Sequence, residues 1–256
     1  MPFEELVDIM RKLRSPDGGC PWDRQQTRKS LTPFLVEETY EVLDAIESGK
    51  PGEIREELGD LLFQIVFHSQ IADEAGEFSI DDVINHIRDK MISRHPHVFG
   101  DVSYETPAEV LAQWEDRKKE EGKQRESLLS GIPSTLPGLL RAQRLQERAA
   151  RVGFDWEKID DVVKKLDEEV SEFKCALVEK NEDAIEDELG DVLFMMVNIA
   201  RFAGANPENA LRRTIGKFIH RFRHIEMSAA ESGRRLTEMT LAEMDALWDE
   251  AKNKGK

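Results

Sequence analysis

Two groups of acidic residues recur along the chain with the same internal spacing. Each group reads Glu-Glu-x-x-Glu and is followed at a fixed distance by Glu-x-x-Asp. Carboxylate oxygens are the ligands that Mg²⁺ prefers, and two such ions can activate a water for displacement at phosphorus. The spacing therefore predicts two metal centres with that chemistry. The first acidic group consists of Glu37, Glu38, Glu41, Glu57 and Asp60, and the second of Glu168, Glu169, Glu172, Glu188 and Asp191. The converging carboxylates, and so the candidate metal ligands, are those other than Glu37 and Glu168.

The two groups belong to a longer internal repeat. Glu38 and Asp60 both recur 131 positions later, and aromatic and basic residues recur around them in the same order. We interpret this pattern as a duplication. Because prolines and a glycine interrupt residues 130–137, we predict domains over residues 1–125 and 138–256 with a linker over residues 126–137. The recurring pairs are Trp22 and Trp156, Lys90 and Lys217, Arg94 and Arg221, and Trp114 and Trp248.

The elements that carry the carboxylates are predicted to be helices, so the expected fold class is all-α. A break at residues 49–52 separates two helical patterns in the first copy, which predicts an antiparallel hairpin. The matching helices of the second copy are predicted over residues 162–178 and 184–202. One apolar stripe of the first hairpin comprises Leu31, Leu35, Val42 and Ala45, interrupted by Glu38. The stripe expected on its second helix, residues 53–75, comprises Ile54, Leu58, Leu61, Ile65 and Ala72.

Helical geometry brings the carboxylates of one copy to the same height. Glu41 lies roughly 10 Å before the end of the first helix, and Asp60 lies about as far after the start of the second. Burying several anions together is costly unless they are protonated or bind cations. A solvated acidic face is the alternative, and the place of Glu38 on an apolar stripe argues against it. We therefore expect a metal ion in each hairpin.

The donor atoms favour Mg²⁺, and Mn²⁺ is the alternative with the same oxygen ligands. All candidate ligands carry oxygen, which disfavours zinc. A di-iron centre would require Glu-x-x-His, and the residues at that spacing are Glu41 and Asp60, so iron is the weaker alternative. His95 and His97 are expected to form a structural or substrate-side turn. The two cysteines, Cys20 and Cys175, have no metal-ligand spacing and are expected to be reduced.

Basic and aromatic residues are candidates for substrate contact. The Lys-x-x-x-Arg pairs place both cations on one helical face, where they could bind phosphate. Trp114 and Trp248 could stack on a base or fill the core. The predicted substrate-binding residues are Lys90, Arg94, Trp114, Lys165, Lys217, Arg221 and Trp248.

Composition restricts the partners and the compartment. With a net charge of −16 over 256 residues, the chain is not expected to bind a nucleic-acid polymer, whereas a small phosphorylated ligand bound with metal ions remains compatible. The N-terminus lacks the basic and apolar segments of a signal peptide, and no apolar run is long enough to span a membrane. We expect a cytoplasmic protein.

With these motifs in view, the chain resembles the MazG family of nucleoside triphosphate pyrophosphohydrolases over essentially its whole length. The tandem acidic motif, Cys20-Pro21-Trp22-Asp23 and residues 94–99 (Arg-His-Pro-His-Val-Phe) carry the resemblance. It implies helical hairpins paired into four-helix cores by dimerisation, and attack at the α-phosphate. It also implies that Lys217, Arg221 and Trp248 contact substrate, and that Glu37 and Glu168 orient or deprotonate water. The implied Mg²⁺ ligands are Glu38, Glu41, Glu57 and Asp60, then Glu169, Glu172, Glu188 and Asp191.

The expected reaction is hydrolysis of a broad range of nucleoside triphosphates to monophosphate and diphosphate. The alternatives are a narrower enzyme acting on dUTP or phosphoribosyl-ATP, and a non-catalytic nucleotide-binding regulator. The two copies differ, because Lys165 precedes Glu169 by one helical turn where the first copy has Phe34. We expect the second domain to carry most of the activity. We also expect a homodimer, with pairing of the tandem copies within one chain as the alternative.

Overall fold

A computed structural model describes residues 1–103, 106 and 127–254. All regular elements of these residues are helical, which confirms the all-α prediction. None of the helices in this part of the chain combines the length and the apolar character that crossing a bilayer requires. The chain forms two compact units, Met1–Lys123 and Gln124–Lys256. The predicted domain boundary stays a prediction, and Trp114 and the first linker residue lie outside the described residues.

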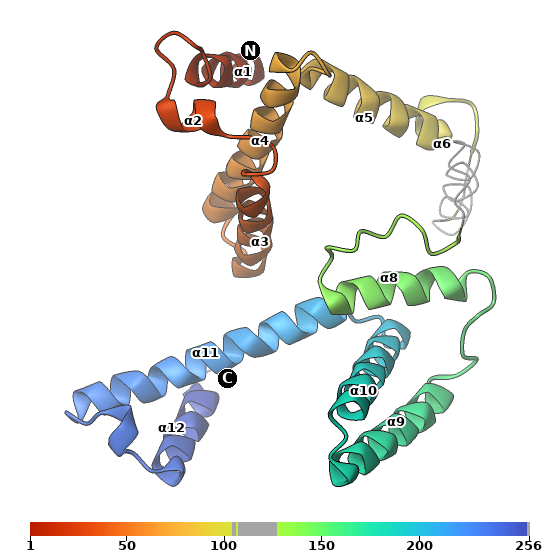
Figure 1. Cartoon of the computed structure of the whole chain (residues 1–256), viewed down its shortest axis with the longest axis vertical. Coiled ribbons are helices and arrows are strands. Elements are labelled where there is room, and N and C mark those ends of the chain that lie inside the picture. Colours follow the sequence, from red (N-terminus) through yellow and green to blue (C-terminus); the bar gives the residue numbers. More distant parts are fainter. Residues whose placement is uncertain (104–105, 107–126, 255–256) are drawn as a thin grey trace. The chain divides into compact units, whose positions relative to one another are not determined.

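The first unit is built around an antiparallel hairpin of α3 (Thr32–Ser48) and α4 (Pro51–Glu74) (Figure 1). Gly49 ends α3 in the left-handed conformation at φ 67°, and Pro51 starts α4. Glycine adopts this conformation without steric cost, and proline fits the first turn of a helix. The remaining helices are α1 (Pro2–Leu13), α2 (Pro21–Gln25), α5 (Ile80–Arg94) and α6 (Pro96–Phe99).

The core of the first unit lies between α1, the start of α3, the C-terminal half of α4 and the start of α5. It is formed by Val7, Met10, Leu31, Val66, Phe67 and Ile80. The expected stripe at α3 is confirmed at Leu31, Val42 and Ala45, which are buried, and Leu35 is half-buried. The stripe expected on α4 is wrong in part. Leu58 and Ile65 are 49% and 41% exposed, because apolar residues surround this helix and one hairpin partner covers a single side.

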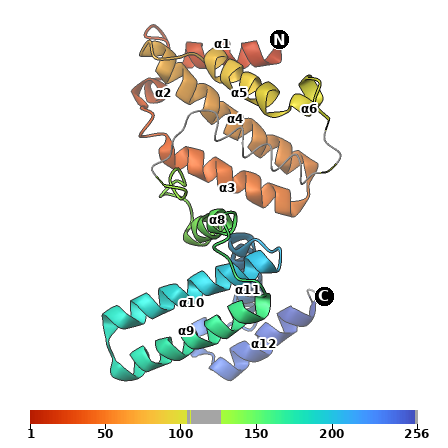
Figure 2. The same ribbon diagram turned by 90° about the vertical axis from the view of Figure 1, so that its right-hand side faces the viewer.

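The second unit repeats this hairpin with α9 (Ile159–Glu179) and α10 (Glu182–Phe202), which lie side by side in Figure 2. Lys180 takes the left-handed conformation at φ 56°, and the side chain of Asn181 accepts a hydrogen bond from the Ala184 backbone N–H at 3.3 Å. Both breaks are shorter than predicted, since the helices begin and end closer to the turn. α8 (Gly138–Ala150) packs against α10, as α1 packs against α4 in the first unit.

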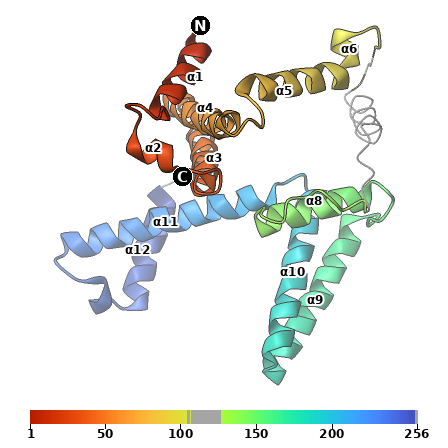
Figure 3. The same cartoon turned by 45° about the horizontal axis from the view of Figure 1, so that its top comes forward.

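A second pair of helices completes this unit. The long helix α11 (Pro207–Glu231) begins beside α8, and α12 (Leu241–Lys254) folds back against it after a short 3₁₀ turn, Leu236–Glu238 (Figure 3). The pair α11–α12 diverges from the hairpin α9–α10 in Figures 1 and 3. The unit therefore carries its predicted metal ligands on one helix pair, and Lys217, Arg221 and Trp248 on the other.

Candidate metal centres and substrate site

Three carboxylates converge across the first hairpin. Glu38 and Glu41 lie one turn apart on α3, and Glu57 faces them from α4. One oxygen from each of the three lies within 4.8 Å of the other two. Burial raises the pKa of Glu38 above its usual value, and the charges of Asp60 and Glu41 raise it further. The pKa of Glu57 is raised by burial and then by the charge of Glu41. The folded chain thus holds these anions where their charged forms are disfavoured.

The second hairpin repeats the arrangement. Oxygens of Glu169, Glu172 and Glu188 lie within 4.8 Å of one another. Glu169 is buried, at 8% exposure. Burial raises the pKa of Glu188, followed by the charges of Glu172 and Asp191. The Oε2 atom of Glu188 is buried and has no hydrogen-bond partner among the described residues.

The two aspartates lie at the edge of these clusters. Asp60 and Asp191 are exposed and do not belong to the groups of oxygens within 4.8 Å. Their charges nevertheless act on the clusters, because they raise the pKa values of Glu38, Glu57 and Glu188. Each hairpin therefore holds three converging carboxylates and a fourth carboxylate nearby.

A divalent cation fits this chemistry. Every donor in the two clusters is a carboxylate oxygen, as Mg²⁺ prefers. A buried carboxylate oxygen without a partner is costly, and a cation would relieve that cost and the mutual repulsion. His95 and His97 do not contribute. They lie at the α5–α6 junction with ring centroids 5.6 Å apart, and His95 Nδ1 lies 2.7 Å from the Met91 carbonyl oxygen.

The two clusters differ in one cation that belongs to the chain. Lys165 Nζ lies 3.1 Å from Glu168 and 3.0 Å from Glu169, and these hydrogen bonds raise the pKa of the lysine. In the first unit the corresponding residue, Phe34, packs edge-on against Trp22 with ring centroids 5.8 Å apart. Glu168 and Glu37 are both exposed, and the ion pair with Lys165 holds Glu168 beside the second cluster.

The predicted Lys-x-x-x-Arg pair of the second unit lies on α11, and Trp248 lies on α12. The Arg221 guanidinium lies 5.3 Å from the centroid of the Trp248 ring, and Phe218 packs edge-on against the same ring at 5.2 Å. Lys217 is exposed one turn before Arg221. Arg221 and Trp248 thus lie against each other, on a different helix pair from the carboxylates of α9 and α10 (Figure 3). In the first unit, Lys90 is half-buried and Arg94 is buried at the end of α5.

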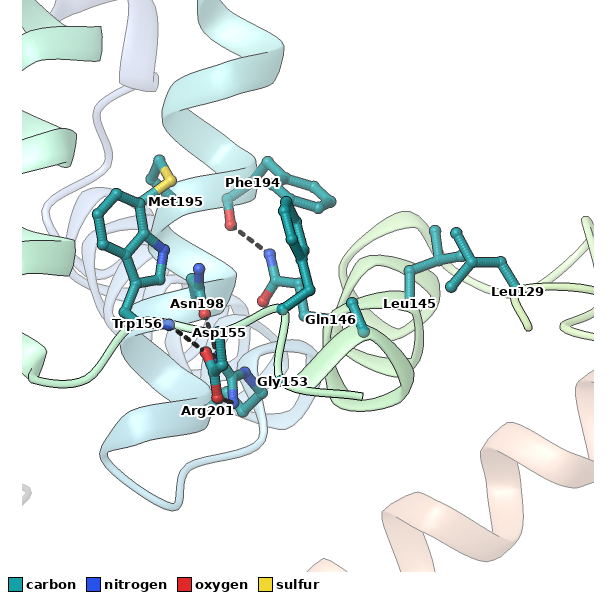
Figure 4. A pocket seen from close by; sticks show the side chains of 12 residues that line it. Leu129, Leu145, Gln146, Gly153, Asp155, Trp156, Phe194, Met195, Asn198 and Arg201 are labelled. Carbon is teal, nitrogen blue, oxygen red and sulfur yellow. Dashed lines mark hydrogen bonds and ion pairs between the residues drawn. The ribbon is translucent and has the colours of Figure 1, made fainter. Parts of the chain in front are cut away.

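A pocket of about 640 Å³ opens between three segments: α8, the connection between α8 and α9, and α10 (Figure 4). The sequence did not predict it. Gln146, Trp156 and Asn198 line it from these three segments. One signal was present in the sequence. Asn198 follows Asp191 by seven residues, which places both on one face of a helix. Gln146 and Trp156 gave no comparable signal, because their proximity depends on the path of the chain.

Comparison with known proteins agrees with the repeat. A family model described as the MazG nucleotide pyrophosphohydrolase domain matches residues 26–99 and 158–226. Each matched stretch contains one complete carboxylate set and one Lys-x-x-x-Arg pair.

Similar proteins extend the match to nearly the whole chain. A Thermotoga maritima protein named nucleoside triphosphate pyrophosphohydrolase/pyrophosphatase MazG is 47% identical over 251 residues, which are 98% of this chain and 95% of that protein. The Escherichia coli (strain K12) nucleoside triphosphate pyrophosphohydrolase is 45% identical over 254 residues, which are 98% of this chain and 97% of that protein. An uncharacterised Bacillus subtilis protein, YabN, is 48% identical over 252 residues, which are 98% of this chain and 51% of that protein.

Proposed function

The chain belongs to the MazG family of nucleotide pyrophosphohydrolases, and on that premise we propose that it hydrolyses nucleoside triphosphates to monophosphate and diphosphate with Mg²⁺ as cofactor. The observation that carries the proposal is the convergence of three carboxylates in each hairpin, with a buried and unpartnered oxygen in the second. Mn²⁺ is an expected substitute, because it accepts the same oxygen ligands.

The roles of the residues follow from their positions. The converging glutamates hold the cation, with Asp60 and Asp191 as additional ligands at the edge. Bound Mg²⁺ supplies polarisation of phosphate oxygens and a bound water of lowered pKa. Glu168, and Glu37 in the first unit, orient the attacking water or accept its proton. Water attacks the α-phosphorus, the bond to the bridging oxygen breaks, and diphosphate leaves. Lys165 can exchange its contact with Glu169 for a phosphate oxygen once the carboxylates bind the cation.

We assign most of the activity to the second unit. Lys165 supplies a cation beside the second cluster, and the first unit has the apolar Phe34 at that position. Lys217, Arg221 and Trp248 add a basic and aromatic surface that can bind the phosphates and the sugar. Lys90, Arg94 and Trp114 are the corresponding candidates in the first unit.

A homodimer is part of the proposal. Each hairpin exposes apolar side chains that a second hairpin would cover, as in a four-helix bundle. On α10, Leu189, Leu193 and Met196 are 44%, 48% and 48% exposed. Leu193 also lines an apolar groove of about 530 Å³ between α8, α10 and α11. The proposed enzyme acts in the cytoplasm on free nucleotides.

Product analysis tests the reaction type. The purified chain is incubated with each nucleoside triphosphate and Mg²⁺, and the first products are separated. We expect the monophosphate and diphosphate in equal amounts, and none when EDTA replaces Mg²⁺. Orthophosphate as the first product would contradict the proposal. A dominant rate with dUTP or phosphoribosyl-ATP would replace the broad range by the narrower alternative, and nucleotide binding without turnover would support a regulator.

Two matched substitutions test the assignment of activity to the second unit. Glu172→Gln and Glu41→Gln remove the same carboxylate from the two clusters. We expect Glu172→Gln to lower kcat for ATP by about 100-fold or more, since a metal contributes several kcal/mol to the transition state. We expect Glu41→Gln to have a much smaller effect. The reverse order of effects would refute the assignment.

A further inference from the structure

The pocket is bounded by α8, by the connection between α8 and α9, and by α10. It contains polar groups with fixed hydrogen-bonding roles. Gln146 and Asn198 are both 7% exposed. Gln146 Nε2 donates to the Phe194 carbonyl oxygen at 2.8 Å, and because a carbonyl only accepts, the amide orientation is fixed. Its Oε1 is buried without a partner among the described residues. The pocket wall therefore contains an unused acceptor.

Asn198 supplies a donor. Its Oδ1 accepts a hydrogen bond from Arg201 Nη2 at 2.7 Å, and arginine has only donors, so the amide NH₂ is directed elsewhere. Arg201 is itself held by Asp155, to which Nη1 donates at 2.9 Å. In Figure 4, Asn198 lies between Trp156 and the amide of Gln146. A buried acceptor and a buried donor thus lie in the wall of one cavity.

Aromatic side chains surround these polar groups. Trp156 is 38% exposed and Phe154 is 82% exposed, although both line the pocket. Exposed aromatic faces beside a cavity can stack on a planar ring. Stacking of this kind accepts any nucleobase, because every base has such a face. The combination of a ring face with one donor and one acceptor matches the edge of a nucleobase.

The pocket lies at a suitable place relative to the second carboxylate cluster. Glu188, Asp191, Met195 and Asn198 follow one another at intervals of three, four and three residues, which places them on one face of α10. Asp191 and Asn198 are about 10 Å apart along the axis at 1.5 Å per residue. This leaves room for a sugar between a phosphate at the cluster and a base in the pocket.

The first unit lacks this chemistry at the equivalent position. The residue 131 positions before Asn198 is Phe67, which is 1% exposed and packs in the core with Val7 and Met10. An apolar ring stands where the second unit has an amide. The polar pocket is therefore a difference between the copies, in the unit to which we assign the activity.

We propose that this pocket binds the base of the nucleoside triphosphate, with Gln146 and Asn198 bonding to its edge and Trp156 covering its face. The inference rests on the proposed function, because it takes a nucleotide as the ligand. All four bases offer a donor beside an acceptor on their pairing edge, so the pocket accommodates a broad range of substrates.

The test compares ATP with ribose 5-triphosphate, which has the sugar and phosphates but no base. Variants Gln146→Leu and Asn198→Leu are assayed with both, and the ratio of their kcat/KM values is determined. We expect the ratio of ATP to ribose 5-triphosphate to fall about tenfold in each variant, as for one lost hydrogen bond to a buried group. We expect Trp156→Ala to lower the ratio and Trp156→Phe to restore most of it.

The controls separate the pocket from the fold and from the reaction. Asn209→Leu makes the same change at an exposed position of α11 and is expected to keep the wild-type ratio. If Asn198→Leu does not fold, Asn198→Asp keeps the acceptor for Arg201 and removes the donor. An unchanged ratio in all pocket variants would overturn the inference while the proposed function stands. If the wild type hydrolyses no triphosphate, the proposed function fails, and calorimetry of AMP binding in EDTA tests the pocket alone. AMP binding that Asn198→Leu abolishes would support it, and absence of AMP binding would overturn it.

Discussion

Glu188 combines a buried, unpartnered oxygen with two neighbouring carboxylates, Glu169 and Glu172, across the hairpin. Each feature disfavours its charged form, and the pKa of Glu188 is raised accordingly. A residue that only supported the fold would gain nothing from this position. The cost to the metal-free protein is therefore an argument for a cation as the missing partner.

Replacing Glu188 by Gln tests this argument in the protein without metal. The variant removes one negative charge and provides a donor to the neighbouring carboxylates. We expect its melting temperature in EDTA to rise, the increase caused by Mg²⁺ to disappear, and ATP hydrolysis to fall about 100-fold or more. Differential scanning calorimetry with and without Mg²⁺ measures the first two effects. Glu186→Gln, on an exposed position of α10, is the matched control. A lower melting temperature in EDTA would contradict the interpretation.

Asp155 shows the opposite electrostatic case. Its hydrogen bonds to Arg201 hold its pKa below the usual value of 3.8. A carboxylate whose pKa is lowered by folding contributes stability above its unfolded pKa and loses it as the pH falls through the folded pKa. We expect Asp155→Asn to lower the melting temperature at pH 7 by about 2–4 °C, if the pair contributes about 1 kcal/mol. The difference from wild type should shrink below about pH 3.8, as measured by thermal unfolding from pH 7 to pH 3. A difference that grows with acidity would exclude this role.

At the scale of the elements, the two hairpins reach the same turn with different residues. Gly49 and Lys180 are 131 positions apart, and both take the left-handed conformation, at φ 67° and φ 56°. That conformation costs a residue with a side chain roughly 1–2 kcal/mol, whereas glycine loses about 0.5–1 kcal/mol of unfolded-state entropy. The second hairpin therefore carries strain that the first avoids.

Exchanging the two residues tests this difference. We expect Lys180→Gly to stabilise the second unit by about 0.5–1 kcal/mol and Gly49→Lys to destabilise the first by a similar amount. Urea unfolding followed by circular dichroism gives both values. Lys180→Ala keeps a Cβ atom and should not reproduce the gain. Equal stabilities of Lys180→Gly and Lys180→Ala would show that the lysine side chain, and not the backbone conformation, decides the effect.

The elements also show how far the sequence could predict the structure. Helical periodicity and the Gly-Lys-Pro break were sufficient for the α3–α4 hairpin, because both are local signals. The buried side of α4 was partly wrong, since Leu58 and Ile65 continue an apolar pattern that one partner helix cannot cover. The pocket was missed because Gln146 and Asn198 are distant in sequence and meet only through the path of the chain.

For the whole molecule, duplication kept the carboxylate clusters and changed their surroundings. The second unit has Lys165 and Asn198 where the first has Phe34 and Phe67. Lys165 and Asn198 provide a cation and an amide near the acidic cluster, whereas Phe34 and Phe67 pack against other apolar groups. A cluster without this cation and amide can still bind a metal ion and stabilise its hairpin. This separates metal binding, which both units should show, from turnover, which we assign to the second.

The exposed apolar surface of α10 leads to a prediction for the assembly. Leu193 is 48% exposed and lines the groove between α8, α10 and α11, where a second copy would cover it. We expect the wild type to be a dimer at micromolar concentration and Leu193→Glu to be a monomer, because burying an unpaired charge in an interface costs several kcal/mol. Light scattering coupled to size-exclusion chromatography measures the mass of both.

Val178→Glu is the control, since Val178 is 82% exposed at the end of α9 and its substitution should leave the dimer intact. A monomeric wild type would refute the pairing of hairpins, and a dimeric Leu193→Glu variant would place the interface on another face. If the dimer completes the site, the monomeric variant should also lose most of its activity toward ATP while its hairpins keep their helical content.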